Sequence, residues 1–132
     1  MSNTAIPKGT SNQDIEARRR IIEAHLNKIK GNSFKCPCLG GVPVLLIGRG
    51  ISEISAHASK SYKSTLAAIR LPELIENSYF YKMYLPKENA QKKKFKFIFL
   101  YELHCKIENG YAKVMVGVRE EAKFLQYCVT VK

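Results

Sequence analysis

The sequence predicts an α+β domain in which N-terminal helices pack on one face of a C-terminal antiparallel β-sheet of three to four strands. Residues from Phe95 to Val131 form three successive runs in which apolar and polar side chains alternate, as they do in half-buried strands. Asn109-Gly110 separates the first two runs, and this dipeptide is typical of a tight hairpin turn. In the residues that precede the runs, apolar side chains recur mainly at helical spacing.

We expect residues 12–132 to form a single domain, preceded by a flexible segment over residues 1–11. A helix is predicted for residues 12–31, with Ser11 or Asn12 as its cap and Gly31 at its end. Its apolar positions follow helical spacing with one gap, at Ile15, Ile22, Leu26 and Ile29. The neighbouring arginines at 18–20 are expected to form a basic cluster on the outer side of the helix.

The middle of the chain predicts a strand followed by short helices. Residues 42–47 have the length and composition of a strand, and Gly48-Arg49-Gly50 is expected to form the turn after it. This glycine pair lacks the third glycine of a dinucleotide-binding loop, so it is weak support for phosphate binding. Residues 51–78 predict two or three short helices, with Pro72 in the first turn of the last one.

Metal binding and membrane insertion are not expected. Cys36 and Cys38 form a C-x-C pair, but a zinc site needs two further ligands at suitable spacing, so we predict no metal and no cofactor. The first ten residues are polar, and no apolar run is long enough to cross a bilayer. The sequence therefore predicts a cytoplasmic protein with reduced cysteines and no membrane partner.

One face of the predicted sheet carries the candidate acid–base groups. In the first run, odd-numbered residues such as Leu103 are expected to face the core, and even-numbered ones to face solvent. The expected solvent face carries Glu102, His104, Lys106, Lys113, Arg119, Gln126 and Thr130. Histidine suits proton transfer because its ordinary pKa lies near neutrality. The alternative is that these residues are only the hydrated side of an antiparallel sheet.

The charge of the chain favours a polyanionic partner, above all RNA. Lysine and arginine number 22 against 11 acidic residues, a net charge of +11. A lysine run follows an aromatic segment, a composition typical of surfaces that bind single-stranded nucleic acid, although a solvated loop would have the same composition. The residues predicted to contact nucleic acid are Tyr84, Lys92, Lys93, Lys94, Lys106 and Lys113. The alternative for the charge as a whole is a basic surface that maintains solubility.

Several short segments resemble the large-polyvalent-protein-associated nuclease domains of phages and mobile elements, within the group of barnase/EndoU/colicin/RelE-like nucleases. These segments are Arg49–His57, Ser61–Ala68 and Leu71–Ser78, followed by the three strands. The resemblance covers residues 42–132 as a nuclease-like core. It implies helices paired with a strongly bent antiparallel sheet of about four strands, and RNA cleavage without a metal ion.

The resemblance also implies an active site. It assigns His57 to that site, completed by Lys63, Arg119 and Thr130, which would bind the scissile phosphate. From the residues alone, His104 with Glu102 is a second acid–base pair.

We therefore predict a metal-independent endoribonuclease of toxin type that acts through attack of the 2′-hydroxyl, with RNA and an immunity or antitoxin protein as partners. The alternative is a catalytically inactive nuclease-like module that binds nucleic acid or a phage or host protein. A small structural protein with a basic surface is the third reading of the same composition.

Overall fold

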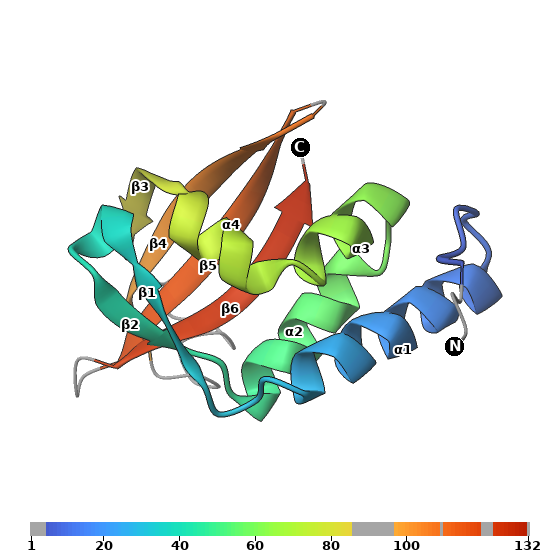
Figure 1. Cartoon of the computed structure of the whole chain (residues 1–132), viewed down its shortest axis with the longest axis horizontal. Helices are drawn as coiled ribbons and strands as arrows, with labels where there is room; N and C mark the ends of the chain where they lie inside the picture. Colours follow the sequence, from blue (N-terminus) through green and yellow to red (C-terminus); the bar gives the residue numbers. More distant parts are fainter. Residues whose placement is uncertain (1–4, 86–96, 109, 120–122, 132) are drawn as a thin grey trace.

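A six-stranded sheet and four α-helices form an α+β fold (Figure 1) in the residues that the structure describes. The structure is a computed structural model that describes residues 5–85, 97–108, 110–119 and 123–131, with only the backbone of Tyr127. The helices are α1 (Asn12–Asn27), α2 (Gly48–Ala58), α3 (Tyr62–Ala68) and α4 (Leu71–Asn77), with a 3₁₀ turn, η1 (Pro37–Leu39). The strands are β1 (Ser33–Cys36), β2 (Val42–Leu45), β3 (Tyr79–Tyr84), β4 (Phe97–Ile107), β5 (Gly110–Arg119) and β6 (Phe124–Val131).

The sheet has the strand order β1-β2-β6-β5-β4-β3. Strands β4, β5 and β6 form the predicted antiparallel meander, and β3 adds to it next to β4. At the other end, β2 pairs in parallel with the first residues of β6, and β1 pairs antiparallel with β2. The sequence prediction of three to four strands was too low, because β1 is only four residues long and β3 is aromatic rather than alternating.

A buried arginine fills the gap in the apolar stripe of α1. Ser11 caps this helix as predicted, since its side chain accepts a hydrogen bond from the backbone of Asp14 at 3.1 Å. Arg18, expected in the outer basic cluster, is instead fully buried, and its Nε donates to the carbonyl of Ser59 at 2.7 Å. Its Nη1 donates to the carbonyls of Pro7 and Gly9 at 2.9 and 2.7 Å. Arg18 therefore ties residues 7–9 to the connection between α2 and α3.

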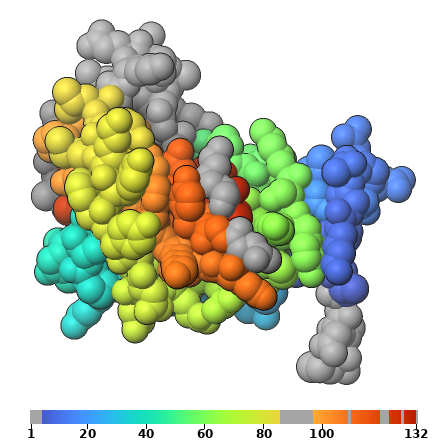
Figure 2. All heavy atoms as spheres, turned by 90° about the horizontal axis from the view of Figure 1, so that it is seen from above, coloured from blue at the N-terminus to red at the C-terminus, as the bar shows by residue number. Residues whose placement is uncertain are grey.

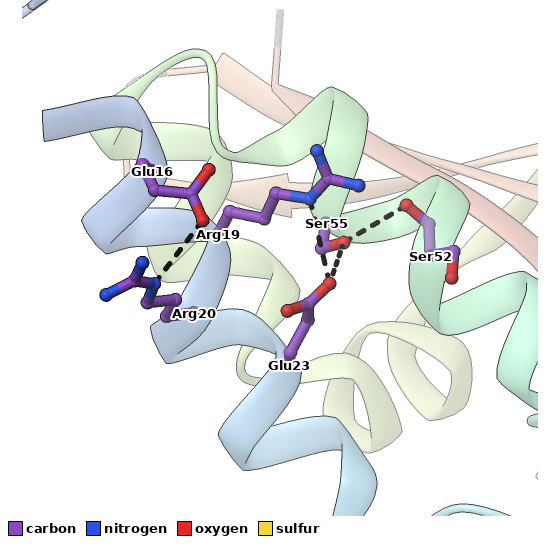
Figure 3. A network of polar contacts seen from close by, with 6 residues as sticks. All are labelled: Glu16, Arg19, Arg20, Glu23, Ser52 and Ser55. Carbon is purple, nitrogen blue, oxygen red and sulfur yellow. Dashed lines mark hydrogen bonds and ion pairs between the residues drawn. The ribbon is translucent and has the colours of Figure 1, made fainter. Parts of the chain in front are cut away.

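The exposed side of α1 carries ion pairs, and its inner side contacts α2 through polar groups (Figure 3). Ser55 on α2 donates to Glu23 at 3.1 Å, and Arg19 lies 3.6 Å from the same carboxylate oxygen. Arg20 pairs with Glu16 one turn earlier, at 3.4 Å. The two arginines of the cluster that remain outside thus form ion pairs within their own helix.

Helices α2 and α3 lie along β6, whereas α4 contacts β1, β4 and β5. Gly48 and Gly50 belong to the first turn of α2, not to a turn before it as predicted. A Cβ on Gly50 would lie 2.4 Å from the backbone oxygen of Gln126, so this glycine allows α2 to approach β6. On α3, the hydroxyl of Ser64 accepts a hydrogen bond from the backbone of Val131 at 2.9 Å. None of the described helices is long and apolar enough to cross a membrane.

Two irregularities in the strand pairing change which side chains face the main core. The main core packs Leu103 and Val129 of the sheet against the helices. The pairing register shifts between Phe97 and Phe99, and again where β5 meets β6. Phe97 and Leu125 were predicted to share a face with Leu103, but they form a separate cluster with Leu100. A single extra residue inverts the alternation of a strand, which also explains why Gln126, predicted to face solvent, is 1% exposed.

Candidate functional site

Three of the predicted site residues lie in one row across the sheet. His104 on β4 pairs in register with Lys113 on β5, and Lys113 pairs with Thr130 on β6. Tyr79 on β3 continues the row on the other side of His104. Directly opposed residues on neighbouring strands have Cβ atoms about 5 Å apart and on the same side of the sheet. We call this side the Glu102 face, because Glu102 lies on it two positions before His104.

The carboxylate of Glu102 is the centre of a polar network on this face. It accepts a hydrogen bond from the hydroxyl of Tyr84 and one from Nε2 of His104, the latter at 2.6 Å. Nζ of Lys113 lies 3.9 Å from the oxygen that Tyr84 contacts. Glu102 and His104 were predicted to face solvent, but they are only 5% and 4% exposed. The prediction was wrong about their exposure because aromatic side chains cover them.

Tyrosine rings enclose the imidazole of His104. The rings of Tyr81 and Tyr111 stack on it at centroid distances of 4.0 and 4.3 Å, with interplanar angles of 17° and 25°. Tyr79 approaches edge-on at 5.9 Å. Tyr79 and Tyr81 belong to β3 and remain 53% and 56% exposed, so the imidazole is buried beneath rings that themselves reach solvent. Figure 2 shows β3, in yellow, at the surface beside the orange strands β4 and β5.

The network fixes the protonation of its acidic members. Burial raises the pKa of the Glu102 carboxyl. Hydrogen bonds from Tyr84 and His104, together with the charge of Lys113, lower it by a larger amount, so the net pKa lies below the usual value. The hydrogen bond to Glu102 raises the pKa of Tyr84 to about 12. At neutral pH the network therefore combines an ionised carboxylate with a tyrosine that keeps its proton. Such a carboxylate can orient an imidazole and stabilise its protonated form.

The residues that the resemblance assigns to an active site lie on several different elements. His57 is in the last turn of α2, with its side chain 44% exposed and Nε2 4.0 Å from Oε1 of Glu53 on the same helix. Lys63 is an exposed residue of α3. Arg119 ends β5, about 20 Å from Lys113 at the usual rise of about 3.4 Å per residue. Of that set, Thr130 is the one in the row of His104 and Lys113.

The predicted nucleic-acid contacts also separate. Tyr84 is partly buried and bonded to Glu102, while Lys106 follows His104 on β4 and is exposed. Lys92, Lys93 and Lys94 lie outside the described residues.

Tyr81 and Tyr111, which cover His104, were not among the predicted site residues. Tyr111 lies two positions before Lys113, so strand alternation could have placed it on the same face.

The cysteines do not assemble a multidentate site in the described part of the chain. The sulfur atoms of Cys36 and Cys38 are 3.6 Å apart, and all four cysteines are free thiols. Burial, with the neighbouring Cys38, raises the pKa of the Cys36 thiol to about 12. Within the described residues, no group of three or more histidine, cysteine, aspartate or glutamate side chains could hold a metal ion.

Comparison with known families gives one match. The family model described as large polyvalent protein-associated domain 3 matches residues 13–125, which run from α1 into β6. The comparisons with curated proteins and with solved structures each found no match. The family match agrees with the large-polyvalent-protein-associated part of the resemblance noted in the sequence. It does not bear on the barnase/EndoU/colicin/RelE-like nuclease fold.

Proposed function

The chain belongs to the large polyvalent protein-associated domain 3 family, and we propose that it is a metal-independent endoribonuclease of toxin type that acts through the Glu102 face. One observation carries the proposal: the imidazole of His104 is hydrogen-bonded to an ionised carboxylate and lies in one row with Lys113 and Thr130. A carboxylate–imidazole pair can transfer protons, and a neighbouring cation can stabilise the charge that develops on a phosphodiester.

In this proposal each group has a role. Nε2 of His104 donates to Glu102, so Nδ1 is the atom that accepts the proton of the RNA 2′-hydroxyl. The 2′-oxygen attacks phosphorus, the bond to the 5′-oxygen breaks, and a water molecule protonates that leaving oxygen. Lys113 and the hydroxyl of Thr130 stabilise the charge that develops on the phosphate, because they are the next residues in the row. Glu102 stabilises the imidazolium that forms.

Access of RNA to His104 depends on Tyr81. The pairing of β3 with β4 shifts at Tyr81, and its ring is more than half exposed. Turning this ring outward uncovers the imidazole and presents a tyrosine face on which a base can stack. Two further exposed residues of β3 lie on the same face, since Tyr79 pairs in register with His104 and Lys82 pairs with Glu102. The net charge of +11 attracts the RNA backbone.

The burial of His104 also favours a second candidate function. An imidazole that is 4% exposed and packed between two rings can serve as a structural part of a stacking surface. The protein would then be the catalytically inactive module, which binds nucleic acid or a phage or host protein. The two candidates share the surface and differ in whether Tyr81 moves.

Cleavage of a single-stranded RNA oligonucleotide in EDTA tests the proposal. The wild type should cut this RNA and leave the matching DNA intact, because DNA lacks the 2′-hydroxyl. His104→Gln keeps a donor for Glu102 and should lower the cleavage rate by about 10²–10⁴-fold. His57→Gln is the matched control, since His57 also lies beside a glutamate, and it should change the rate less than about twofold, by our weighing of an exposed pair.

The other outcomes separate the alternatives. RNA binding without cleavage by the wild type would establish the inactive module. Loss of cleavage in His57→Gln with retention in His104→Gln would move the site to α2, as the resemblance implies. Thermal unfolding of each variant measures whether a change in the cleavage rate arises from loss of the fold.

A further inference from the structure

A concave site lies between the helices and the end of β4, on the other side of the sheet from the Glu102 face. A cavity of about 820 Å³ that opens to solvent is lined by residues of α3, α4 and the end of β4. This volume is within the range of about 300–1,000 Å³ typical of small-molecule sites. Its apolar lining consists of Leu66, Ala67, Leu74, Cys105 and Ile107. The Glu102 face does not use this cavity in the mechanism above.

Basic side chains from two different walls line the cavity. Lys63 comes from α3 and Lys106 from β4, and both are exposed residues. Arg70 also lines it, but its guanidinium is 2.7 Å from the carboxylate of Glu73. Glu108, at the end of the lining next to Ile107, is a second acidic residue there, so the cations exceed the carboxylates by one. An apolar floor with two lysines from opposite elements suits a ligand that has a flat, weakly polar body and one anionic group. A nucleotide has this chemistry, since its base is flat and its phosphate is anionic.

The cavity and the Glu102 face are linked through one strand. Lys106 lies two positions after His104, about 7 Å further along β4. It pairs in register with Tyr111, the residue whose ring stacks on His104. Cys105 and Ile107, which line the cavity, face the helices, so the cavity and the Glu102 face lie on opposite sides of the sheet. In the described residues β3 pairs with β4 only as far as His104, and Lys106 lies beyond that point. A chain of nucleotides that follows β4 across the Glu102 face therefore reaches Lys106 and then the cavity by passing round this edge of the sheet.

We propose that this cavity is a subsite for one nucleotide of the bound RNA, with its phosphate between Lys63 and Lys106 and its base against Leu66. This inference rests on the proposed RNA substrate and adds a second binding position to it. The side chain of Leu66 is 37% exposed, so it forms part of an accessible wall instead of the closed core.

Titration of the isotope-labelled protein with uridine monophosphate, followed by NMR, tests the subsite. The amide signals of residues that line the cavity should shift, and a single-stranded RNA oligonucleotide should displace the mononucleotide. Leu66→Trp places a bulky ring where the base would lie, and Lys63→Gln removes one of the cations. Each should weaken binding at least tenfold. Lys35→Gln is the matched control, because it removes an equal charge from an exposed position on β1.

Three results would overturn the inference. The first is that the NMR shifts are confined to residues of the Glu102 face. The second is that inorganic phosphate binds as tightly as uridine monophosphate, and the third is that RNA does not displace the mononucleotide. Failure here is distinguishable from failure of the proposed function. If the wild type cuts RNA but its cavity binds no mononucleotide, the proposed function stands and the subsite is rejected. If His104→Gln still binds the mononucleotide but no longer cuts RNA, both the proposed function and the subsite are supported.

Discussion

Two glutamate–histidine pairs in this chain have the same chemistry and opposite surroundings. Glu53 and His57 lie one turn apart on α2, 4.0 Å from each other, with side chains 19% and 44% exposed. Glu102 and His104 lie on β4 at 2.6 Å, with side chains 7% and 5% exposed. Water screens the first pair, so it contributes little. The second pair is desolvated and shares its carboxylate with Tyr84 and Lys113, so removal of one member leaves buried polar groups without partners.

The largest expected difference between the two pairs is in stability. Glu102→Ala should lower the free energy of unfolding by about 3 kcal/mol, because it leaves His104 and the Tyr84 hydroxyl without their acceptor. Glu53→Ala should cost less, because its histidine partner lies 4.0 Å away and is 44% exposed. Urea unfolding of both variants measures the contrast. Equal losses would show that the network on the sheet is no stronger than an exposed helical pair.

The second expected difference is in the pH dependence of stability. The pKa of Glu102 is lowered from 4.5 by folding, so the folded state binds fewer protons at this site than the unfolded state does. Its contribution to stability is therefore fully present above the unfolded pKa and is lost as the pH falls through the lower folded-state pKa. The difference in free energy of unfolding between wild type and Glu102→Gln should be constant near neutrality and shrink below about pH 4.5. A difference that does not change down to acid unfolding would contradict this account.

A smaller effect is expected from removing one hydroxyl of the network. Tyr84→Phe should lower the free energy of unfolding by about 1 kcal/mol, because a hydrogen bond to a charged group is lost at a partly buried position. Tyr111→Phe keeps its stacked ring and serves as the control. Spectrophotometric titration adds an independent measurement, since the tyrosine with a pKa of about 12 should disappear in Tyr84→Phe alone.

The smallest expected effect is at the exposed histidine. His57→Ala should change the free energy of unfolding by less than about 0.5 kcal/mol, and added salt should reduce even that difference. Thermal unfolding at low and high salt is sufficient to measure it. A loss above about 1 kcal/mol would mean that the α2 pair is stronger than its exposure allows.

Local patterns predicted the elements of this fold better than the faces of its sheet. Alternation located β4, β5 and β6, and Ser11 was correctly identified as a cap of α1. The same alternation failed for Phe97 and Gln126, because a bulge inverts the facing of every residue beyond it. No local rule places a bulge in a strand without a glycine or proline to mark it. The burial of Arg18 was indicated locally by its position, because Arg18 occupies the gap in the apolar stripe of α1.

The candidate site illustrates the same limit at longer range. The row of His104, Lys113 and Thr130 follows from strand order and register, and alternation had already placed all three on one side. The burial of that side depends on Tyr81, which lies on a different strand, β3, and stacks on His104 only in the folded protein. Such a contact is set by the tertiary fold, so the exposure of His104 could not be derived from its neighbours in the chain. Periodicity also could not show that the Glu102–His104 pair is buried and the Glu53–His57 pair on α2 is more exposed.

The short parallel pairing of β2 with β6 has a consequence for how the molecule assembles. Val44 and Leu45 meet Phe124 and Leu125, so an early hairpin completes its hydrogen bonding only with the final strand. Contacts between such distant parts of a chain slow folding, because a large loop must close before they form. A ribosome-bound chain that ends before β6 would therefore leave the β1–β2 hairpin with an open edge, and release of the last strand would complete the sheet.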